Sequence, residues 1–254
     1  MSVLRICTVY PDLLGTYGDG GNGAILERRA AWRGLAVELM TPVSSEPLPE
    51  ADVYCLGGGE DGPQVLAAER LAGDGALTRA VERGAVVLAV CAGFQILGRS
   101  FPDAGGTTRP GLGLLAMTTA KGTGHRAVGE LVADVVDLAD GGLGIDALSG
   151  FENHGGVTTL EGGLAPLAHV RPGAGIGNGG GDGSEGALDG RIVGTYLHGP
   201  VLARNPQLAD QLLCWATGLD VLEPLDDDVA LSLRAERLRA VSQAKSRVAG
   251  ARRR

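Results

Sequence analysis

The sequence predicts an α/β fold: a mostly parallel sheet with helices on both faces, extended by antiparallel strands in the C-terminal half. Short apolar runs alternate with helical segments through the first 100 residues, a pattern typical of parallel sheets. Glycine-rich loops follow three of these runs, after residues 10, 56 and 90. Beyond Gly105 strand-like segments dominate, so we expect the additional strands there.

The predicted elements follow from where apolar residues recur and where glycine or proline interrupts them. In the first half, strands are expected at 3–10, 36–40, 52–56 and 85–90, and helices at 24–34, 64–72 and 76–83. In the second half, strands are expected at 111–117, 126–136, 164–171 and 190–196, and helices at 205–217 and 227–250. Residues 1–225 should form one domain, with 226–254 as a C-terminal helix and basic tail packed on it or trailing from it.

Composition narrows the function classes. The 254 residues carry a net charge of −8, which argues against nucleic acid as the main partner, because phosphate contacts need a basic face. The four cysteines lack CxxC spacing, so we expect neither a disulfide framework nor a metal site. The N-terminus does not resemble a signal peptide, and no apolar stretch is long enough to span a bilayer. These features predict a cytoplasmic protein without a transmembrane segment.

Residues 86–98 contain the strongest candidate for chemistry. The apolar strand 86–90 runs directly into Cys91, and small residues and a helical pattern follow. A thiol at such a strand-to-helix turn stands clear of the sheet, near a helix N-terminus that favours the thiolate. The alternative is a buried core cysteine, which is the usual environment of a free thiol.

A nucleophilic cysteine needs a base from the same edge of the sheet. His198 ends a β-run just before Gly199-Pro200 and meets this requirement best, with His154 as the second candidate. The turn Gly57-Gly58-Gly59 offers backbone N–H groups that, with that of Ala92, can bind an oxyanion. The sequence contains no Walker motif and no dinucleotide-binding G-x-G-x-x-G, so we do not expect ATP or NAD to bind this chain.

These residues resemble a known family, the class I (triad-type) glutamine amidotransferases, through Cys91-Ala92-Gly93-Phe94-Gln95, the upstream glycine turn and His198. Within it the chain is similar to the cobyric-acid-synthase-like branch, and there most similar to the glutaminase subunits of lipid II isoglutaminyl synthases. The segments that carry this similarity are YGDGGN (17–22), GFENHGG (150–156), GNGGGDGSEG (177–186) and GTYLHGPVLARNP (194–206). The resemblance covers nearly the whole chain and implies a flavodoxin-like sheet.

The resemblance also implies a reaction. Cys91 would attack the side-chain amide of L-glutamine, His198 would protonate the departing ammonia, and water would cleave the γ-glutamyl thioester. The oxyanion would be held by the backbone N–H groups of Gly58, Gly59 and Ala92. Gln95 would help to seat glutamine. Arg126 matches the family's substrate-binding arginine, whose guanidinium suits bidentate capture of the α-carboxylate; its alternative is an ordinary surface residue on a strand.

One feature departs from the wider family. Most members carry His-x-Glu, whose acid orients the imidazole, whereas Gly199-Pro200 follows His198 here. Within this chain Glu152 or Asp19 can supply the acid, and the resemblance suggests another source, an aspartate of the partner subunit. An acid supplied by the partner would couple glutamine hydrolysis to assembly.

The implied partner resembles a Mur ligase. It would bind ATP and Mg²⁺, activate the α-carboxyl of D-glutamate in the lipid II stem peptide, and use ammonia from this chain, which would need no cofactor itself. Competing interpretations are the glutaminase component of a corrin-amidating enzyme, a stand-alone γ-glutamyl hydrolase, and an inactive binding subunit, which the retention of Cys91 and His198 disfavours. The glycine-rich loop 172–186 is interpreted either as a mobile lid or as a plain connector.

Overall fold

A six-stranded sheet forms the centre of the computed structural model, which describes residues 3–136 and 145–251, the last ten of these as backbone only. Its strand order is β13 (Ala187–Asp189), β14 (Ile192–Thr195), β4 (Val86–Val90), β3 (Val53–Leu56), β1 (Leu4–Val9) and β2 (Val37–Met40). Every neighbouring pair is parallel except β13 with β14. The predicted fold class is therefore confirmed, and β13 is the antiparallel extension of the main sheet.

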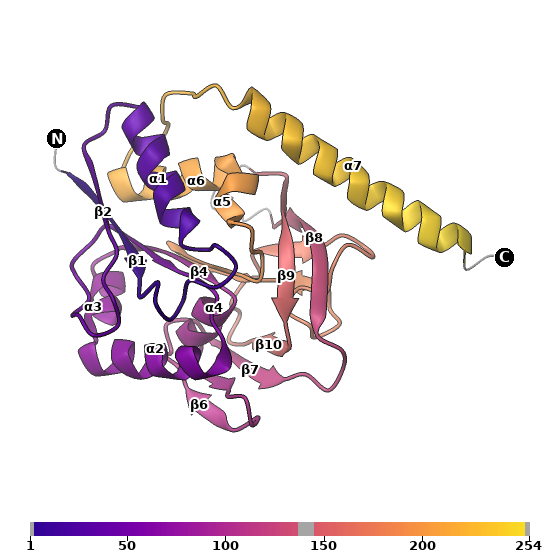
Figure 1. Ribbon diagram of the computed structural model, residues 1–254, viewed down its shortest axis with the longest axis horizontal. Coiled ribbons are helices and arrows are strands. Elements are labelled where there is room, and N and C mark those ends of the chain that lie inside the picture. The colour runs from indigo at the N-terminus through magenta and orange to yellow at the C-terminus, as the bar shows by residue number, and fades with distance from the viewer. Residues whose placement is uncertain (1–2, 137–144, 252–254) are drawn as a thin grey trace.

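Helices cover both faces of this sheet (Figure 1). The helices α1 (Gly21–Trp32) and α6 (Pro206–Thr217) lie on one side, and α2 (Asp61–Asp74) and α3 (Ala76–Glu82) on the other. The short helices α4 (Ala92–Leu97) and α5 (Val201–Arg204) each follow a strand of the sheet. The C-terminal helix α7 (Asp228–Ala251) runs past α5 and extends beyond the body of the molecule.

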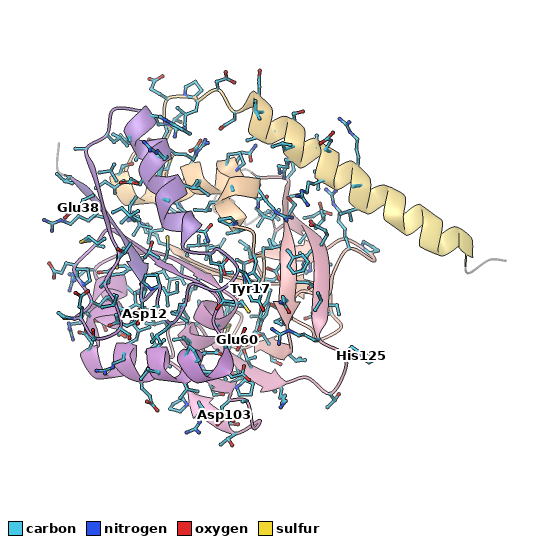
Figure 2. All side chains as sticks on the ribbon, in the orientation of Figure 1. Asp12, Tyr17, Glu38, Glu60, Asp103 and His125 are labelled. Carbon is cyan, nitrogen blue, oxygen red and sulfur yellow. The ribbon has the colours of Figure 1, made fainter. Side chains whose placement is uncertain are left out.

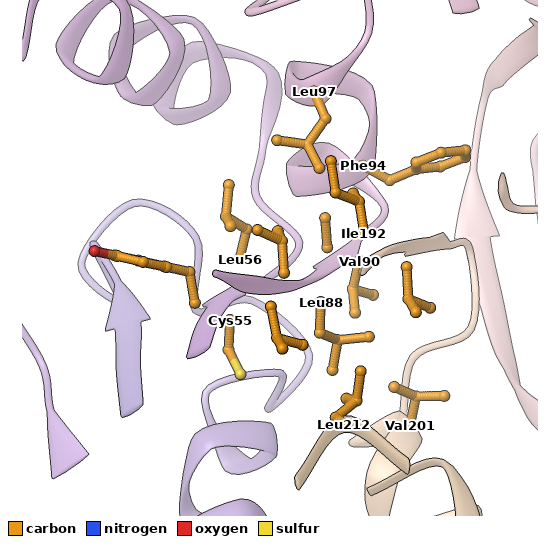
Figure 3. Packing of buried hydrophobic residues seen from close by; sticks show 14 of the residues in the cluster. Cys55, Leu56, Leu88, Val90, Phe94, Leu97, Ile192, Val201 and Leu212 are labelled. Carbon is orange, nitrogen blue, oxygen red and sulfur yellow. The ribbon is translucent and has the colours of Figure 1, made fainter. Parts of the chain in front are cut away.

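The core is built around β4, whose five residues are all buried. In Figure 3, Leu88 lies on the side of Leu212 of α6, and Leu97 of α4 lies on the opposite side of the strand. Burying a leucine side chain contributes about 1.5–3 kcal/mol, so this central strand is held firmly from both faces. A rigid β4 fixes the position of the residue that follows it, Cys91.

The remaining strands form two smaller, mostly antiparallel sheets beside the main one. The first has the order β10 (Gly156–Leu160), β7 (Met117–Lys121), β5 (Ser100–Pro102) and β6 (Thr108–Pro110). The second has the order β12 (Ser184–Glu185), β11 (Ala168–Val170), β8 (Ala127–Val135) and β9 (Ala147–His154). The long β8–β9 pair connects this half to the main sheet, because Phe151 of β9 bridges to His198 after β14.

The prediction of a strand at 111–117 is wrong. Residues 111–116 instead wrap around the end of α4, where the N–H groups of Leu112 and Leu115 donate to the carbonyls of Ile96 and Leu97. These carbonyls belong to the last turn of α4 and lack N–H donors within the helix, so the segment that follows supplies the missing hydrogen bonds. The strand β7 begins only at Met117.

The glycine-rich loop 172–186 is a packed part of the fold. The side chain of Asn178 is fully buried; its amide donates to the carbonyl of Gly186, whose N–H it accepts in return. The carboxylate of Glu152 accepts the N–H groups of Ile176 and Gly177. These contacts tie the loop to β9, so the geometry offers no support for a lid. Within the described ranges, no helix is long and apolar enough to cross a membrane.

Candidate active site

Cys91 lies at a strained turn between β4 and α4. Its backbone has φ 51° and ψ −104°, a region that residues with a side chain rarely adopt and that costs on the order of 1–3 kcal/mol. The turn is held by two backbone hydrogen bonds, from the Cys91 N–H to Thr195 and from the Gln95 N–H to the Cys91 carbonyl. Such a conformation aims the thiol away from the sheet, which is the geometry of a nucleophile elbow.

Small residues make this turn possible. A Cβ at Gly93 would lie 2.6 Å from that of Leu56, and one at Gly194 would lie 2.1 Å from the ring of Phe94. The helix α4 therefore approaches β3 and β14 more closely than any larger residue permits. Ala92 is the first residue of α4, so its N–H has no acceptor within the helix and is available to a ligand.

His198 forms a buried pair with Asp19. Its Nδ1 is 2.7 Å from Oδ2 of Asp19, and both residues are 1% exposed. The backbone of His198 is fixed by a reciprocal pair of hydrogen bonds with Phe151. The edge of the Tyr17 ring packs against the imidazole, with the ring centres 5.0 Å apart. Because Asp19 occupies Nδ1, only Nε2 remains for proton exchange with the thiol, and this nitrogen has no hydrogen-bond partner among the described residues.

The electrostatics favour a protonated His198. Burial alone would lower the pKa of this imidazole, but the hydrogen bond that it donates to Asp19 and the interaction with Cys91 outweigh it and raise the pKa to about 10. An imidazolium next to a thiol stabilises the thiolate. Cys91 and His198 are thus brought together as the sequence predicts.

The triple glycine turn serves a different purpose from the predicted one at Gly58. The N–H of Gly58 donates to Oδ2 of Asp19 at 2.9 Å and is therefore already engaged. A Cβ at this position would lie 2.7 Å from the His198 ring, and Cβ atoms at Gly57 and Gly59 would collide with carbonyls of the loop after β1. The glycines let that loop and the histidine pack closely, and only the N–H groups of Gly59 and Ala92 remain for an oxyanion.

A pocket of about 220 Å³ opens at Cys91. Its lining includes Ala92, Gly59 and Gln95, and Arg126 lies on its wall just before β8. The Arg126 guanidinium donates to the side-chain and backbone oxygens of Asn153. The rim carries charged residues of both signs, namely Asp61, Asp103, Lys121 and Arg126.

Gln95 is held in a buried polar network beneath the pocket. Its Oε1 accepts from Gln64 at 2.9 Å, and its Nε2 donates to the Tyr196 hydroxyl at 3.1 Å. The ring of His154 stacks on that of Tyr196 with centres 3.8 Å apart. Nδ1 of His154 is hydrogen-bonded to the Gly156 carbonyl, so this second candidate base supports the pocket floor and does not form a pair like that of His198.

The structure decides between the acids within the chain. Glu152 is bound to the backbone of the 172–186 loop and lies 3.8 Å from Nε2 of His154, so it does not orient His198. Asp19 does, which differs from the expected aspartate of a partner subunit. Local sequence does not mark this pairing, because the two residues are 179 positions apart. The only signal was that loops after parallel strands converge at one sheet edge.

Comparison with known proteins agrees with this geometry. Residues 5–206 match the model of the CobB/CobQ-like glutamine amidotransferase domain. The chain is 35% identical to the lipid II isoglutaminyl synthase (glutamine-hydrolyzing) subunit GatD of Staphylococcus aureus, over 97% of this chain and 100% of that protein. It is 32% identical to the subunit of the same name from Streptococcus pneumoniae, over 89% and 86% of the two chains.

Solved structures share the fold at lower identity. PurLQS from Thermotoga maritima has a TM-score of 0.58 at 15% identity and covers 86% of this chain and 98% of that one. A glutamine amidotransferase from Thermotoga maritima has a TM-score of 0.53 at 15% identity, covering 95% and 94%. With the family match over most of the chain and an interacting cysteine–histidine pair, the protein belongs to the CobB/CobQ-like glutamine amidotransferases.

Proposed function

We propose that this protein is the glutaminase subunit of a lipid II isoglutaminyl synthase. The observation that carries the proposal is the buried Asp19–His198 pair next to Cys91, which lies at the strained turn and lines a pocket together with Arg126. Support for the acceptor comes from two relatives that are at least 32% identical over most of the chain.

The chemistry follows from the positions of these groups. The Cys91 thiolate attacks the side-chain amide carbon of L-glutamine, and the Ala92 and Gly59 N–H groups stabilise the oxyanion. Nε2 of the His198 imidazolium gives its proton to the leaving ammonia, and a γ-glutamyl thioester remains on the sulfur. The now neutral imidazole accepts a proton from water as the water attacks the thioester, which releases glutamate and restores the thiolate–imidazolium pair.

The pocket rim suits the zwitterionic end of an amino acid. The guanidinium of Arg126 and the ammonium of Lys121 can attract the α-carboxylate, and Asp61 or Asp103 the α-ammonium. Gln95 acts as part of the floor, because Gln64 and Tyr196 hold both ends of its amide.

The ammonia would pass to a synthase subunit of the Mur-ligase type. That partner would bind ATP and Mg²⁺ and activate the α-carboxyl of D-glutamate in the lipid II stem peptide, so the chain studied here would need no cofactor. We place the complex in the cytoplasm, where free thiols such as Cys91 stay reduced.

The test uses the co-purified complex with Cys91→Ala. Glutamine-dependent amidation of lipid II should disappear, whereas amidation with added ammonium salt should stay at the wild-type rate. Cys55→Ala, a buried thiol outside the pocket, is the matched control and should retain both activities. Retained glutamine-dependent activity in Cys91→Ala would disprove the nucleophile assignment.

A stand-alone γ-glutamyl hydrolase is the second candidate, favoured because Asp19, His198 and Cys91 all come from one chain. The isolated protein would then cleave γ-glutamyl peptides at least as fast as glutamine. A strong preference for free glutamine excludes it.

A further inference from the structure

A groove of about 690 Å³ lies away from the catalytic pocket. It runs between α1, the α5–α6 segment and α7. Three large apolar side chains on its walls are strongly exposed: Trp32 at 65%, Val229 at 75% and Leu233 at 58%. Exposed apolar side chains gathered along one groove are typical of a surface that another molecule covers.

The groove carries more basic than acidic side chains, although the whole chain has a net charge of −8. Five arginines and two aspartates line it. Three of the arginines are paired, Arg29 with Asp210 and Asp227, and Arg204 and Arg237 with Glu130. Arg28 and Arg234 form no ion pair with a described residue, so their guanidinium groups are donors that a carboxylate can bind.

The C-terminal segment adds to this charge. Residues 228–254 contain eight basic and two acidic residues. The helix α7, which covers 228–251, extends beyond the body of the molecule (Figure 1). A basic arm of this kind speeds encounter with an acidic protein surface. A flat bilayer cannot enter a concave groove, whereas a helix or loop of another protein can.

The groove connects to both halves of the catalytic pair. Gly199, which follows His198 in the chain, lines the groove. One wall is formed by α1, which begins directly after the loop that carries Asp19. The two segments touch: a Cβ at Gly21 would lie 2.6 Å from the ring of Pro200. An occupant therefore contacts the elements that hold Asp19 and His198 without entering the substrate pocket.

We infer that this groove is the docking site for an acidic, apolar segment of the synthase partner, which packs on Trp32 and Leu233 and places carboxylates opposite Arg28 and Arg234. The inference rests on the proposed function, because it takes the partner from there. It adds the surface that the partner uses and the chemistry that recognises it.

The test measures binding of the full-length synthase subunit to the full-length protein. Leu233→Glu should weaken the affinity at least tenfold, because it places a carboxylate among the apolar contacts and beside the acidic segment. Arg28→Glu should slow association and reduce its dependence on salt concentration. Val221→Glu is the matched control: its side chain is 81% exposed but does not line the groove, so its affinity should stay within twofold of wild type.

Three outcomes contradict the inference about the groove. Wild-type affinity in both Leu233→Glu and Arg28→Glu excludes the groove as the docking site. A wild-type dimer that Leu233→Glu dissociates assigns the groove to a second copy, and binding of wild type, but not Leu233→Glu, to vesicles of anionic phospholipid assigns it to a membrane. Unchanged glutamine hydrolysis and melting temperature of Leu233→Glu show that the variant is folded. An active wild-type protein that does not bind the synthase at all refutes the partner named under the proposed function instead.

Discussion

Replacing Asp19 with asparagine tests how His198 is activated. Asparagine has nearly the same shape, so its carbonyl oxygen can still accept one of the two donors that now share Oδ2, the Gly58 N–H and His198 Nδ1. The charge that stabilises the imidazolium is lost, whereas the burial of the ring is unchanged. The substitution therefore isolates the electrostatic contribution of this carboxylate.

The size of the effect follows from the kind of bond that is lost. A hydrogen bond to a charged group is worth about 1.5–3 kcal/mol, which corresponds to roughly a 10- to 150-fold decrease in kcat. The KM for glutamine should change little, because Asp19 does not line the pocket at Cys91. Asp12→Asn is the matched control, since Asp12 lies on the same loop but bonds to Ser44.

The pH dependence has a defined sign. The pKa of His198 is raised to about 10 by Asp19 and Cys91 against the effect of burial. Stability from this raised pKa is fully present below about 6.5 and is lost as the pH rises through about 10. Removing the Asp19 charge lowers the pKa of His198, so the alkaline limb of kcat/KM, which reports loss of the imidazolium, should move below its wild-type position.

A stopped assay of glutamate release between pH 6 and 11 measures both effects on the isolated protein and on its complex. The reasoning is refuted if Asp19→Asn keeps the wild-type kcat and the same alkaline limb. It is also refuted if the isolated wild-type protein is inactive and gains activity only with its partner, because the acid would then come from the partner.

Three further substitutions probe substrate binding and packing. Arg126→Met should raise the KM for glutamine roughly 10- to 150-fold with little change in kcat, if its guanidinium binds the α-carboxylate. Gly194→Ala should lower the free energy of unfolding by about 1–3 kcal/mol, because its Cβ would meet the ring of Phe94. Gly73→Ala is the control, because a Cβ there has free space and should not destabilise the protein. Thermal melting of the two variants compares them. Arg29→Met should cost about 3 kcal/mol, because it leaves Asp227 without its cation and Asp210 paired only with Arg33. The hydrogen bond from Arg29 holds the pKa of Asp227 below its usual range, so the loss should shrink as the pH falls and this carboxylate takes up a proton, and urea unfolding at pH 7 and pH 4 measures it.

The strands and helices of the first hundred residues could be predicted because their signal is local. The run 86–90 is apolar throughout and too short for a helix, and β4 covers those residues. The strand β9 gave no such signal. It carries Ser149, Glu152 and His154, all buried, so its sequence has the polarity of a loop although it lies between two packed layers.

Within the candidate site, the residues that belong to a recognisable sequence motif were predictable. Cys91 and His198 end strands, and topology brings strand ends together. The choice of Asp19 over Glu152 and the purpose of Gly58 were not predictable, because both depend on the path of the loop after β1. That path is fixed by contacts between backbone segments far apart in sequence, such as the bridge between Thr16 and Gly58.

Because the orienting acid lies on a loop, its position relative to His198 does not depend on the strand end alone. An acid two residues after the histidine would be fixed by the same strand end, so the pair would form whenever the sheet folds. Asp19 instead lies on a loop whose Tyr17 has a φ of 64° and is 44% exposed while its ring packs against His198. Tyr17 (Figure 2) is held in a conformation costly for a residue with a side chain. Because its ring packs against His198, displacing the ring would be expected to weaken the hydrogen bond between Asp19 and His198 and, with it, glutamine hydrolysis.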